Sequence, residues 1–253
     1  MKDIIISRLR EIEQAENVRI LHAVESGSRA WGFASPDSDY DVRFIYVRSK
    51  DYYLRLDKTR DVIELPISED LDINGWDLDK TLMLLHKSNP TLFEWFQSPI
   101  TYIKTDFYET VQPYLREYFY SVKGLFHYLS MAKSNYREYL KGATVKAKKY
   151  FYVIRPLLAC RWIMERNCPP PMLFSELVDA ELPQELKPYI DNLLDIKMNS
   201  PEVKEIPKIQ AINDFIEKEI ECIASKINST ETEPSASWDD LNKLFLSEIE
   251  KYN

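Results

Sequence analysis

The spacing of apolar residues changes along the chain and separates a first part with strands from a helical remainder. Ile5, Leu9 and Ile12 fall on one face of a helix predicted over residues 2–16. Short apolar runs bounded by turn residues then predict strands near residues 18–25, 40–48, 61–67 and 71–73.

Helix signals dominate the rest of the chain. Asp77 can cap a helix over about 78–88, and Pro90 can open the next one after Asn89. From Pro99 to about residue 165 the pattern is mostly helical. Further helices are predicted near residues 173–180, 183–196, 205–227 and 238–251, with a polar linker at 228–237.

Composition and charge narrow the class of protein. With 45% hydrophobic and 13% aromatic residues, the chain is expected to be globular. No apolar run is long enough to span a membrane, and three unpatterned cysteines suit the reducing cytoplasm. A net charge of −8 argues against a wide nucleic-acid footprint, yet residues 133–166 hold nine basic residues against two acidic ones. This local charge favours a compact anionic ligand, such as a triphosphate or a short nucleic-acid end.

The candidate chemistry lies where a Gly27-Ser28 turn is followed by Asp39-Tyr40-Asp41 and an apolar run. If residues 39–47 form a strand, Asp39 and Asp41 point to the same face. Two carboxylates that close repel each other unless a cation lies between them, and Mg²⁺ prefers such oxygen ligands. The Gly-Ser turn can present backbone N–H groups to a phosphate.

A plain turn is the alternative interpretation of this stretch. Residues 35–39, Ser-Pro-Asp-Ser-Asp, could simply join two strands. That interpretation explains Pro36 and Asp37, but it does not explain Asp41, a carboxylate at the head of an apolar strand.

The combination of Gly-Ser with Asp-x-Asp on a strand resembles the signature of the polymerase-β-like nucleotidyltransferase superfamily. The resemblance implies that Asp39 and Asp41 bind metal and that Gly27, Ser28 and Arg29 contact the nucleotide. It also implies two Mg²⁺ ions, with Mn²⁺ as a substitute, and a third carboxylate from a neighbouring strand.

Several acids between residues 61 and 79 could supply that third carboxylate. We choose Asp72, because Leu71 and Ile73 flank it as apolar strand residues flank Asp41. Glu64, on a strand of similar character, is the alternative.

The basic segment suggests where the triphosphate could be held. Lys141, Lys148 and Arg155 are spaced by two helical turns, and Tyr152 fits the same face. Such a stripe could bind the β- and γ-phosphates, since Arg and Lys are both phosphate ligands. A solvated helix face is the alternative.

Further strings narrow the resemblance. Residues 27–33 and 35–43, together with Lys148-Lys149-Tyr150 through Arg155-Pro156, look like predicted nucleotidyltransferases that include RNA-ligase-associated polymerase-β-like proteins. The resemblance implies an α+β fold: a nucleotidyltransferase domain with a mixed sheet, then a helical substrate-binding domain, then a polar linker with a C-terminal helix. We place these parts at residues 1–105, 106–227 and 228–253.

The implied activity is metal-dependent transfer of an NMP from an NTP to a hydroxyl acceptor. The acceptor classes that stay open are an RNA end, a protein and a small molecule. A nucleotide-binding module without chemistry is the remaining alternative, and the intact pair Asp39 and Asp41 counts against it. We expect no membrane partner and a cytoplasmic location.

Overall fold

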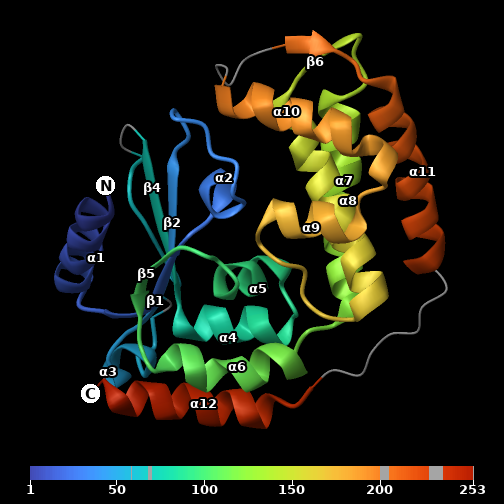
Figure 1. Cartoon of the computed structure of the whole chain (residues 1–253). Coiled ribbons are helices and arrows are strands. Elements are labelled where there is room, and N and C mark those ends of the chain that lie inside the picture. The colour runs from blue at the N-terminus through green and yellow to red at the C-terminus, as the bar shows by residue number, and fades with distance from the viewer. Residues whose placement is uncertain (58, 68–69, 200–204, 228–235, 253) are drawn as a thin grey trace. The chain divides into compact units, whose positions relative to one another are not determined.

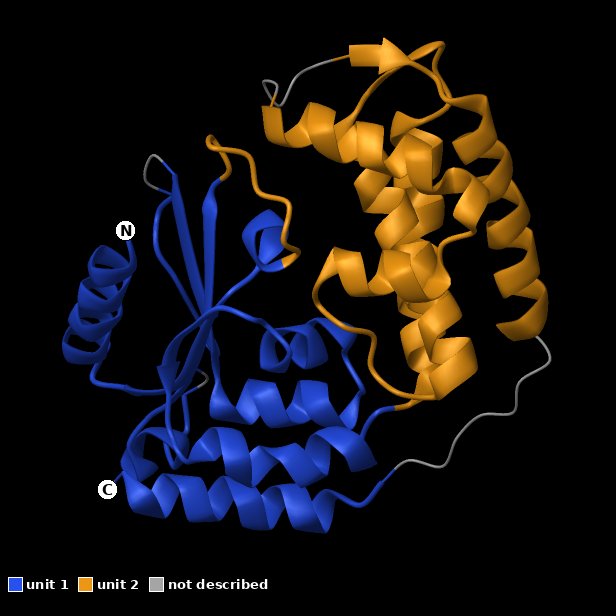
Figure 2. Ribbon diagram, viewed as in Figure 1, with its two compact units in different colours: residues 1–30, 39–119, 234–253 blue, residues 31–38, 120–233 orange. Residues whose placement is uncertain are grey.

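The computed structural model describes the chain except for residues 58, 68–69, 200–204, 228–235 and 253 (Figure 1). Contacts between backbone positions divide it into two compact units (Figure 2). We call the first the sheet unit, which comprises residues 1–30, 39–119 and 234–253. The second is the helical unit, which comprises residues 31–38 and 120–233.

A five-stranded mixed sheet forms the centre of the sheet unit, and the α+β class predicted from the sequence is confirmed. Its strands are β1 (Arg19–Glu25), β2 (Tyr40–Val47), β3 (Val62–Glu64), β4 (Leu71–Asp77) and β5 (Thr101–Lys104). They lie in the order β3-β4-β2-β1-β5, with β2 and β4 parallel and the other neighbours antiparallel.

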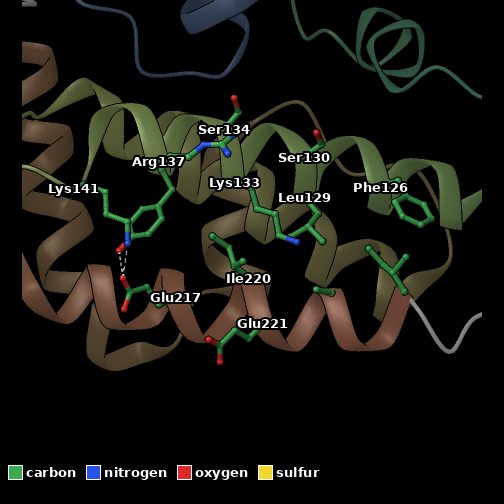
Figure 3. Close-up of a pocket in the computed structure, with 13 residues that line it drawn as sticks. Phe126, Leu129, Ser130, Lys133, Ser134, Arg137, Lys141, Glu217, Ile220 and Glu221 are labelled. Atoms are coloured by element: carbon green, nitrogen blue, oxygen red, sulfur yellow. Dashed lines mark hydrogen bonds and ion pairs between the residues drawn. The ribbon is translucent and has the colours of Figure 1, made fainter.

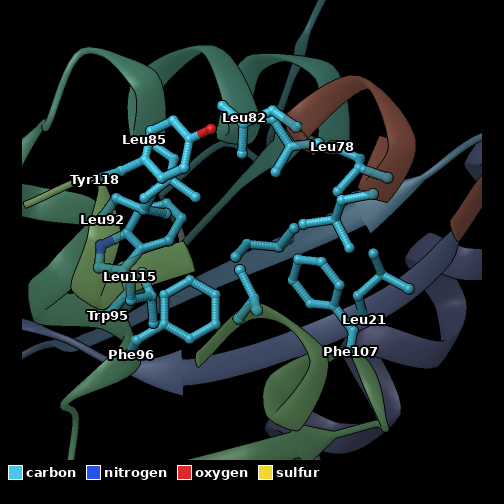
Figure 4. Close-up of a cluster of buried hydrophobic side chains, with 14 of the residues drawn as sticks. Leu21, Leu78, Leu82, Leu85, Leu92, Trp95, Phe96, Phe107, Leu115 and Tyr118 are labelled. Atoms are coloured by element: carbon cyan, nitrogen blue, oxygen red, sulfur yellow. The ribbon is translucent and has the colours of Figure 1, made fainter. Parts of the chain in front are cut away.

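Helices cover both faces of this sheet. They are α1 (Lys2–Glu16), α2 (Gly27–Ala30), α3 (Lys50–Tyr53), α4 (Leu78–His86), α5 (Pro90–Phe96), α6 (Phe107–Glu117) and α12 (Trp238–Lys251). On one face, Ile5 and Leu9 of α1 share a buried cluster with Phe44 of β2. On the other face, α4, α5, α6 and α12 bury a second apolar cluster that includes Leu21 of β1 and Leu82 of α4 (Figure 4).

The helical unit is built around α7 (Ser121–Tyr139) and α8 (Lys148–Arg166), which pack against each other. Around them lie α9 (Phe174–Glu181), a 3-10 turn η1 (Gln184–Leu186), α10 (Lys187–Asn199) and α11 (Gln210–Ile227), with a two-stranded sheet of β6 (Thr144–Lys146) and β7 (Glu205–Pro207). Residues 31–38 belong to this unit because Phe33 packs against Phe151 and Phe174, with ring centroids 4.7 and 5.3 Å away.

Two predicted strands differ from the structure for local reasons. The strand predicted over 61–67 is shorter and ends at Glu64, ahead of Pro66, which has no N–H to donate to a sheet. The strand predicted over 71–73 is longer and runs through Gly75 to Asp77. Gly75 is tolerated there because the ring of Phe44 occupies the space of a side chain, 2.2 Å from an ideal Cβ position.

Two predicted helical stretches contain strands. The stretch predicted as mostly helical from Pro99 begins with β5 at residues 101–104, which pairs with β1. The helix predicted over 205–227 starts only at Gln210, because residues 205–207 pair with β6. The predicted linker at 228–237 lies mainly outside the described residues.

The compact units are also bounded differently from the expected domains. Helix α6, expected within a helical domain at 106–227, lies in the sheet unit because Phe107 and Val111 join its apolar cluster. Helix α12, expected in a separate part at 228–253, packs into the same cluster through Leu241 and Leu244. None of the helices among the described residues has the length and apolar character required to cross a bilayer.

Candidate active site

Two of the candidate carboxylates meet on the parallel pair β2 and β4. Asp41 and Asp72 are directly opposite in the register of these strands. Asp39 immediately precedes β2 and is exposed, two positions from Asp41. The structure therefore places Asp72 beside Asp41. Glu64 is on β3, on the other side of β4 from Asp41, where it lies opposite Asn74 of β4.

The guanidinium of Arg43 bridges the two paired carboxylates. Its Nη2 donates to Asp41 Oδ1 at 3.1 Å and to Asp72 Oδ2 at 2.7 Å. Its Nη1 donates to the carbonyl oxygens of Val42 and Asp72. A positive charge thus lies where the repulsion of two neighbouring carboxylates requires one. Sequence reasoning missed Arg43, although its position two residues after Asp41 places it on the same strand face.

Burial and charge both act on Asp41. Burial raises the pKa of its carboxyl group above the usual range, and the charges of Asp72 and Asp39 raise it further. Arg43 and Arg29 oppose these effects and lower the pKa of Asp41. A divalent cation would act in the same direction as Arg43 and more strongly, because it carries a larger charge.

Gly27 lies directly against the Asp41 carboxylate. An ideal Cβ at position 27 would lie 2.0 Å from Asp41 Oδ2, and the backbone φ of Gly27 is +57°. Only glycine combines that conformation with that close approach. Ser26 N–H donates to the Asp41 carbonyl oxygen at 2.8 Å, which ties the start of α2 to β2.

Arg29 and Glu25 hold the backbone on either side of these carboxylates. Arg29 Nε donates to the Asp39 carbonyl oxygen at 3.1 Å, and its guanidinium lies 3.6 Å from the ring centroid of Tyr40. Glu25 is fully buried at the end of β1 and accepts hydrogen bonds from Asp41 N–H at 2.8 Å and from the Tyr102 hydroxyl. Burial raises the pKa of Glu25. Sequence reasoning missed Glu25; an acid that closes an apolar strand was the available signal.

The oxygen donors suit Mg²⁺, although Arg43 now occupies part of their hydrogen-bonding capacity. Three carboxylates on or next to two neighbouring strands offer hard ligands, and the side chains of Asp41 and Asp72 are 29% and 32% exposed. Within the described part of the chain, no three acidic, histidine or cysteine side chains are already arranged as a metal cage. Metal binding therefore requires Asp41 and Asp72 to exchange the guanidinium for the ion or to share it.

The predicted cationic stripe is only partly formed, because Lys141 lies outside α8. Helix α7 ends at Tyr139, and Lys141 is exposed in the following turn, where its Nζ pairs with Glu217 Oε1 at 3.0 Å. The predicted place of Lys141 in the stripe is therefore wrong, since a turn and strand β6 separate it from α8.

The remaining members of the stripe are all on α8. Lys148 and Tyr152 are partly exposed, but Arg155 is only 3% exposed. The Arg155 guanidinium lies 4.8 Å from the ring centroid of Trp31, and its Nη2 is 3.5 Å from the Met172 carbonyl oxygen. Arg155 thus has a packing role within the helical unit, and the phosphate contact predicted for it stays a prediction.

Comparisons with known proteins bear on the family of the chain. A model of the RlaP family, described as the RNA repair pathway DNA polymerase beta family, matches residues 1–247. The uncharacterized protein YcgL of Bacillus subtilis (strain 168) is 46% identical over 253 residues, covering 99% of this chain and 97% of that protein. Among solved structures, a nucleotidyltransferase-like protein from Exiguobacterium sibiricum covers 98% of this chain and 80% of its own, with 10% identity and a TM-score of 0.31.

Proposed function

The chain belongs to the RNA repair pathway DNA polymerase beta family, and on that premise we propose that it is a metal-dependent nucleotidyltransferase. It would transfer an NMP from an NTP to a hydroxyl group, and the acceptor we favour is an RNA end. The observation that supports this proposal is the in-register pair of Asp41 and Asp72, with Asp39 two residues away and Gly27 against the Asp41 carboxylate.

The three carboxylates share a proposed metal-binding role, and Asp72 has a second role. Asp39, Asp41 and Asp72 would hold two Mg²⁺ ions, or Mn²⁺ as substitutes, which supply charge stabilisation at the attacking and leaving oxygens. Asp72 would accept the proton of the acceptor hydroxyl as its oxygen attacks the α-phosphorus. The bond from the α-phosphorus to the bridging oxygen breaks, and pyrophosphate leaves. Glu25 would keep the Asp41 backbone in place through the hydrogen bond to its N–H group.

The nucleotide contacts are proposed from the same turn and from α8. Backbone N–H groups at Gly27 and Ser28 would donate to phosphate oxygens, with Arg29 close by. Lys148 and Tyr152 would contact the β- and γ-phosphates. Arg155 stays the least favoured member of this set because of its burial.

Incubation with each labelled NTP and Mg²⁺ or Mn²⁺ tests the proposal. RNA, protein and small-molecule acceptors are compared, and Asp41→Asn serves as the inactive control. We expect label on RNA with the wild type and none with Asp41→Asn. If only a protein or a small molecule is labelled, that molecule and not RNA is the acceptor. If the chain binds nucleotide but labels no acceptor, it is a nucleotide-binding module and not a transferase.

A further inference from the structure

A groove of about 920 Å³ runs along the helical unit between α7 and α11 (Figure 3). Its α7 side presents Phe126, Ser130, Lys133 and Arg137, which follow one another at helical spacings of three or four residues and are all exposed. Such spacing places them in a single row along one helix face. Lys133 and Arg137 belong to the basic segment 133–166 of an otherwise acidic chain.

The two cations of this row are available to a ligand. Neither Lys133 nor Arg137 forms a hydrogen bond or ion pair with any residue that the structure describes. They are one helical turn apart, about 6 Å along the axis, which is comparable with the spacing of successive phosphates along a nucleic-acid strand. Lysine gives a point charge and arginine a planar fork of donors, so both can bind phosphate oxygens.

The acids on the opposite side interfere little with an anion. Glu217 of α11 accepts hydrogen bonds from the Tyr136 hydroxyl at 2.5 Å and from Lys141 Nζ at 3.0 Å, and the charge of Lys141 offsets its own. Glu221 is exposed, and in Figure 3 its carboxylate points away from α7.

An aromatic ring completes the row. Phe126 is 56% exposed, which is unusual for a large apolar side chain unless it has a binding role. It borders both the groove and an adjoining hollow lined by His127 and Met131. An exposed ring in line with two cations is the combination by which single strands are bound: bases stack on the ring and phosphates lie on the cations.

We propose that the groove between α7 and α11 binds a single-stranded segment of the RNA acceptor. Phosphates of the strand contact Lys133 and Arg137, and a base stacks on Phe126. Ser130 and Ser134 line the groove beside them and offer hydroxyls to phosphate oxygens or 2′-hydroxyl groups. The inference rests on the proposed function in one respect, namely that the acceptor is RNA.

Fluorescence anisotropy of the full chain with a labelled single-stranded 12-nucleotide RNA tests the groove, without NTP or metal. We expect Lys133→Ala/Arg137→Ala to weaken binding at least tenfold and Phe126→Ala about tenfold. The double variant should also lower the slope of log affinity against log salt by about 1.4, because two phosphate contacts are lost. Arg116→Ala/Lys218→Ala removes two exposed charges outside the groove and should change neither quantity. Melting curves confirm that each variant is folded.

Three outcomes would contradict the proposed RNA binding in the groove. The first is that the wild type binds no RNA, and the second is that the groove variants bind RNA as tightly as the wild type. The third is that only the charge variants lose affinity while Phe126→Ala binds normally. Displacement of RNA by a polyglutamate peptide at equal concentration of charge would show a peptide site instead. The binding measurement is separate from the transfer assay, because it contains neither NTP nor metal. If no acceptor is labelled but RNA binding still depends on the groove residues, only the proposed transferase activity is refuted.

Discussion

The two ends of the β2–β4 pair share one backbone arrangement and have opposite chemistry. At one end Ile45 lies opposite Trp76, which stacks on Trp95 of α5 with ring centroids 3.8 Å apart. At the other end Asp41 lies opposite Asp72, and their side chains stay 29% and 32% exposed. Helices cover the apolar end and leave the charged end accessible. The covering by helices, and not the strand pairing, thus determines which of these side chains stay exposed.

Two acids on the single strand β4 extend this comparison. Asp72 is partly exposed and contacts Arg43, whereas Asp77 is 2% exposed at the other end of the strand. Asp77 Oδ1 accepts hydrogen bonds from the Tyr53 hydroxyl at 2.6 Å and from Asp79 N–H at 3.3 Å, so it caps α4. Two aspartates five residues apart on one strand therefore differ in role: the role proposed for Asp72 is catalytic, and that of Asp77 is structural.

The strongest test of the charged end is Asp72→Asn. The substitution is nearly isosteric but removes a charge from the proposed metal site. We expect transfer to fall about a thousandfold or more, since a metal contributes several kcal/mol to such a transition state. Turnover is measured at saturating Mg²⁺, with Asp39→Asn and Asp41→Asn as companions. The melting temperature should change little, and wild-type turnover in any of the three would refute the assignment of that carboxylate.

Gly27→Ala tests the close approach at the same end. The added Cβ would lie 2.0 Å from Asp41 Oδ2, so the carboxylate must move. We expect transfer to fall about a hundredfold, because a misplacement of about 1 Å can have that effect. Gly32→Ala is the matched control, since its φ of +89° carries backbone strain but its Cβ meets Leu173 instead. If both variants lose activity equally, strain and not the Asp41 contact is responsible.

The apolar pattern predicted most elements of the fold but not their pairing. The helix over 2–16, the strands near 18–25 and 40–48, and the Asp77 cap are confirmed because they depend on local periodicity and capping. The neighbours of β2 depend on long-range packing. Strand β5 and the shift of α6 into the sheet unit were missed because their apolar residues fit either arrangement.

The same limit applies to the candidate site. Asp39 could be selected from the Asp-x-Asp pattern after Gly27-Ser28, and Asp41 and Asp72 because an acid is unusual beside apolar strand residues. Their roles stay predictions. Arg43 and Glu25 were not selected, because the signals within their own strands do not show the contacts that they make across strands. The burial of Arg155 was equally hidden, since helical spacing does not tell which face of α8 meets Trp31.

At the apolar end, Asp77→Asn should change how stability depends on pH. Burial, mainly, and the charge of Asp79 raise the pKa of Asp77 to about 7, while Tyr53 and Arg48 oppose this effect. Because the folded-state pKa lies above the unfolded value, the stabilisation is present below about pH 4 and is lost as pH rises through 7. The free energy of unfolding of the wild type relative to Asp77→Asn should therefore fall by about 2–4 kcal/mol from pH 4.5 to 8.5.

Denaturant unfolding of both proteins at the two pH values measures this difference. Asparagine remains a good N-cap, so the cap itself is kept. A difference that stays constant with pH would show that Asp77 is ionised throughout, like an exposed carboxylate. Transfer by Asp77→Asn at pH 7 should stay close to the wild type, which separates this end of the strand from the charged end.

The smallest effect is expected for Glu64→Gln, which decides between the two candidates for the third carboxylate. Glu64 Oε1 accepts a hydrogen bond from Asn74 Nδ2 at 3.1 Å, and Oε2 pairs with Arg60 at 2.6 Å. Glutamine can keep the first contact and loses an exposed ion pair worth about 0.2–1 kcal/mol. Transfer should stay within about twofold of the wild type, since β4 separates Glu64 from Asp41. Assayed beside Asp72→Asn at saturating Mg²⁺, a large loss with Glu64→Gln and none with Asp72→Asn would move the third metal ligand to β3.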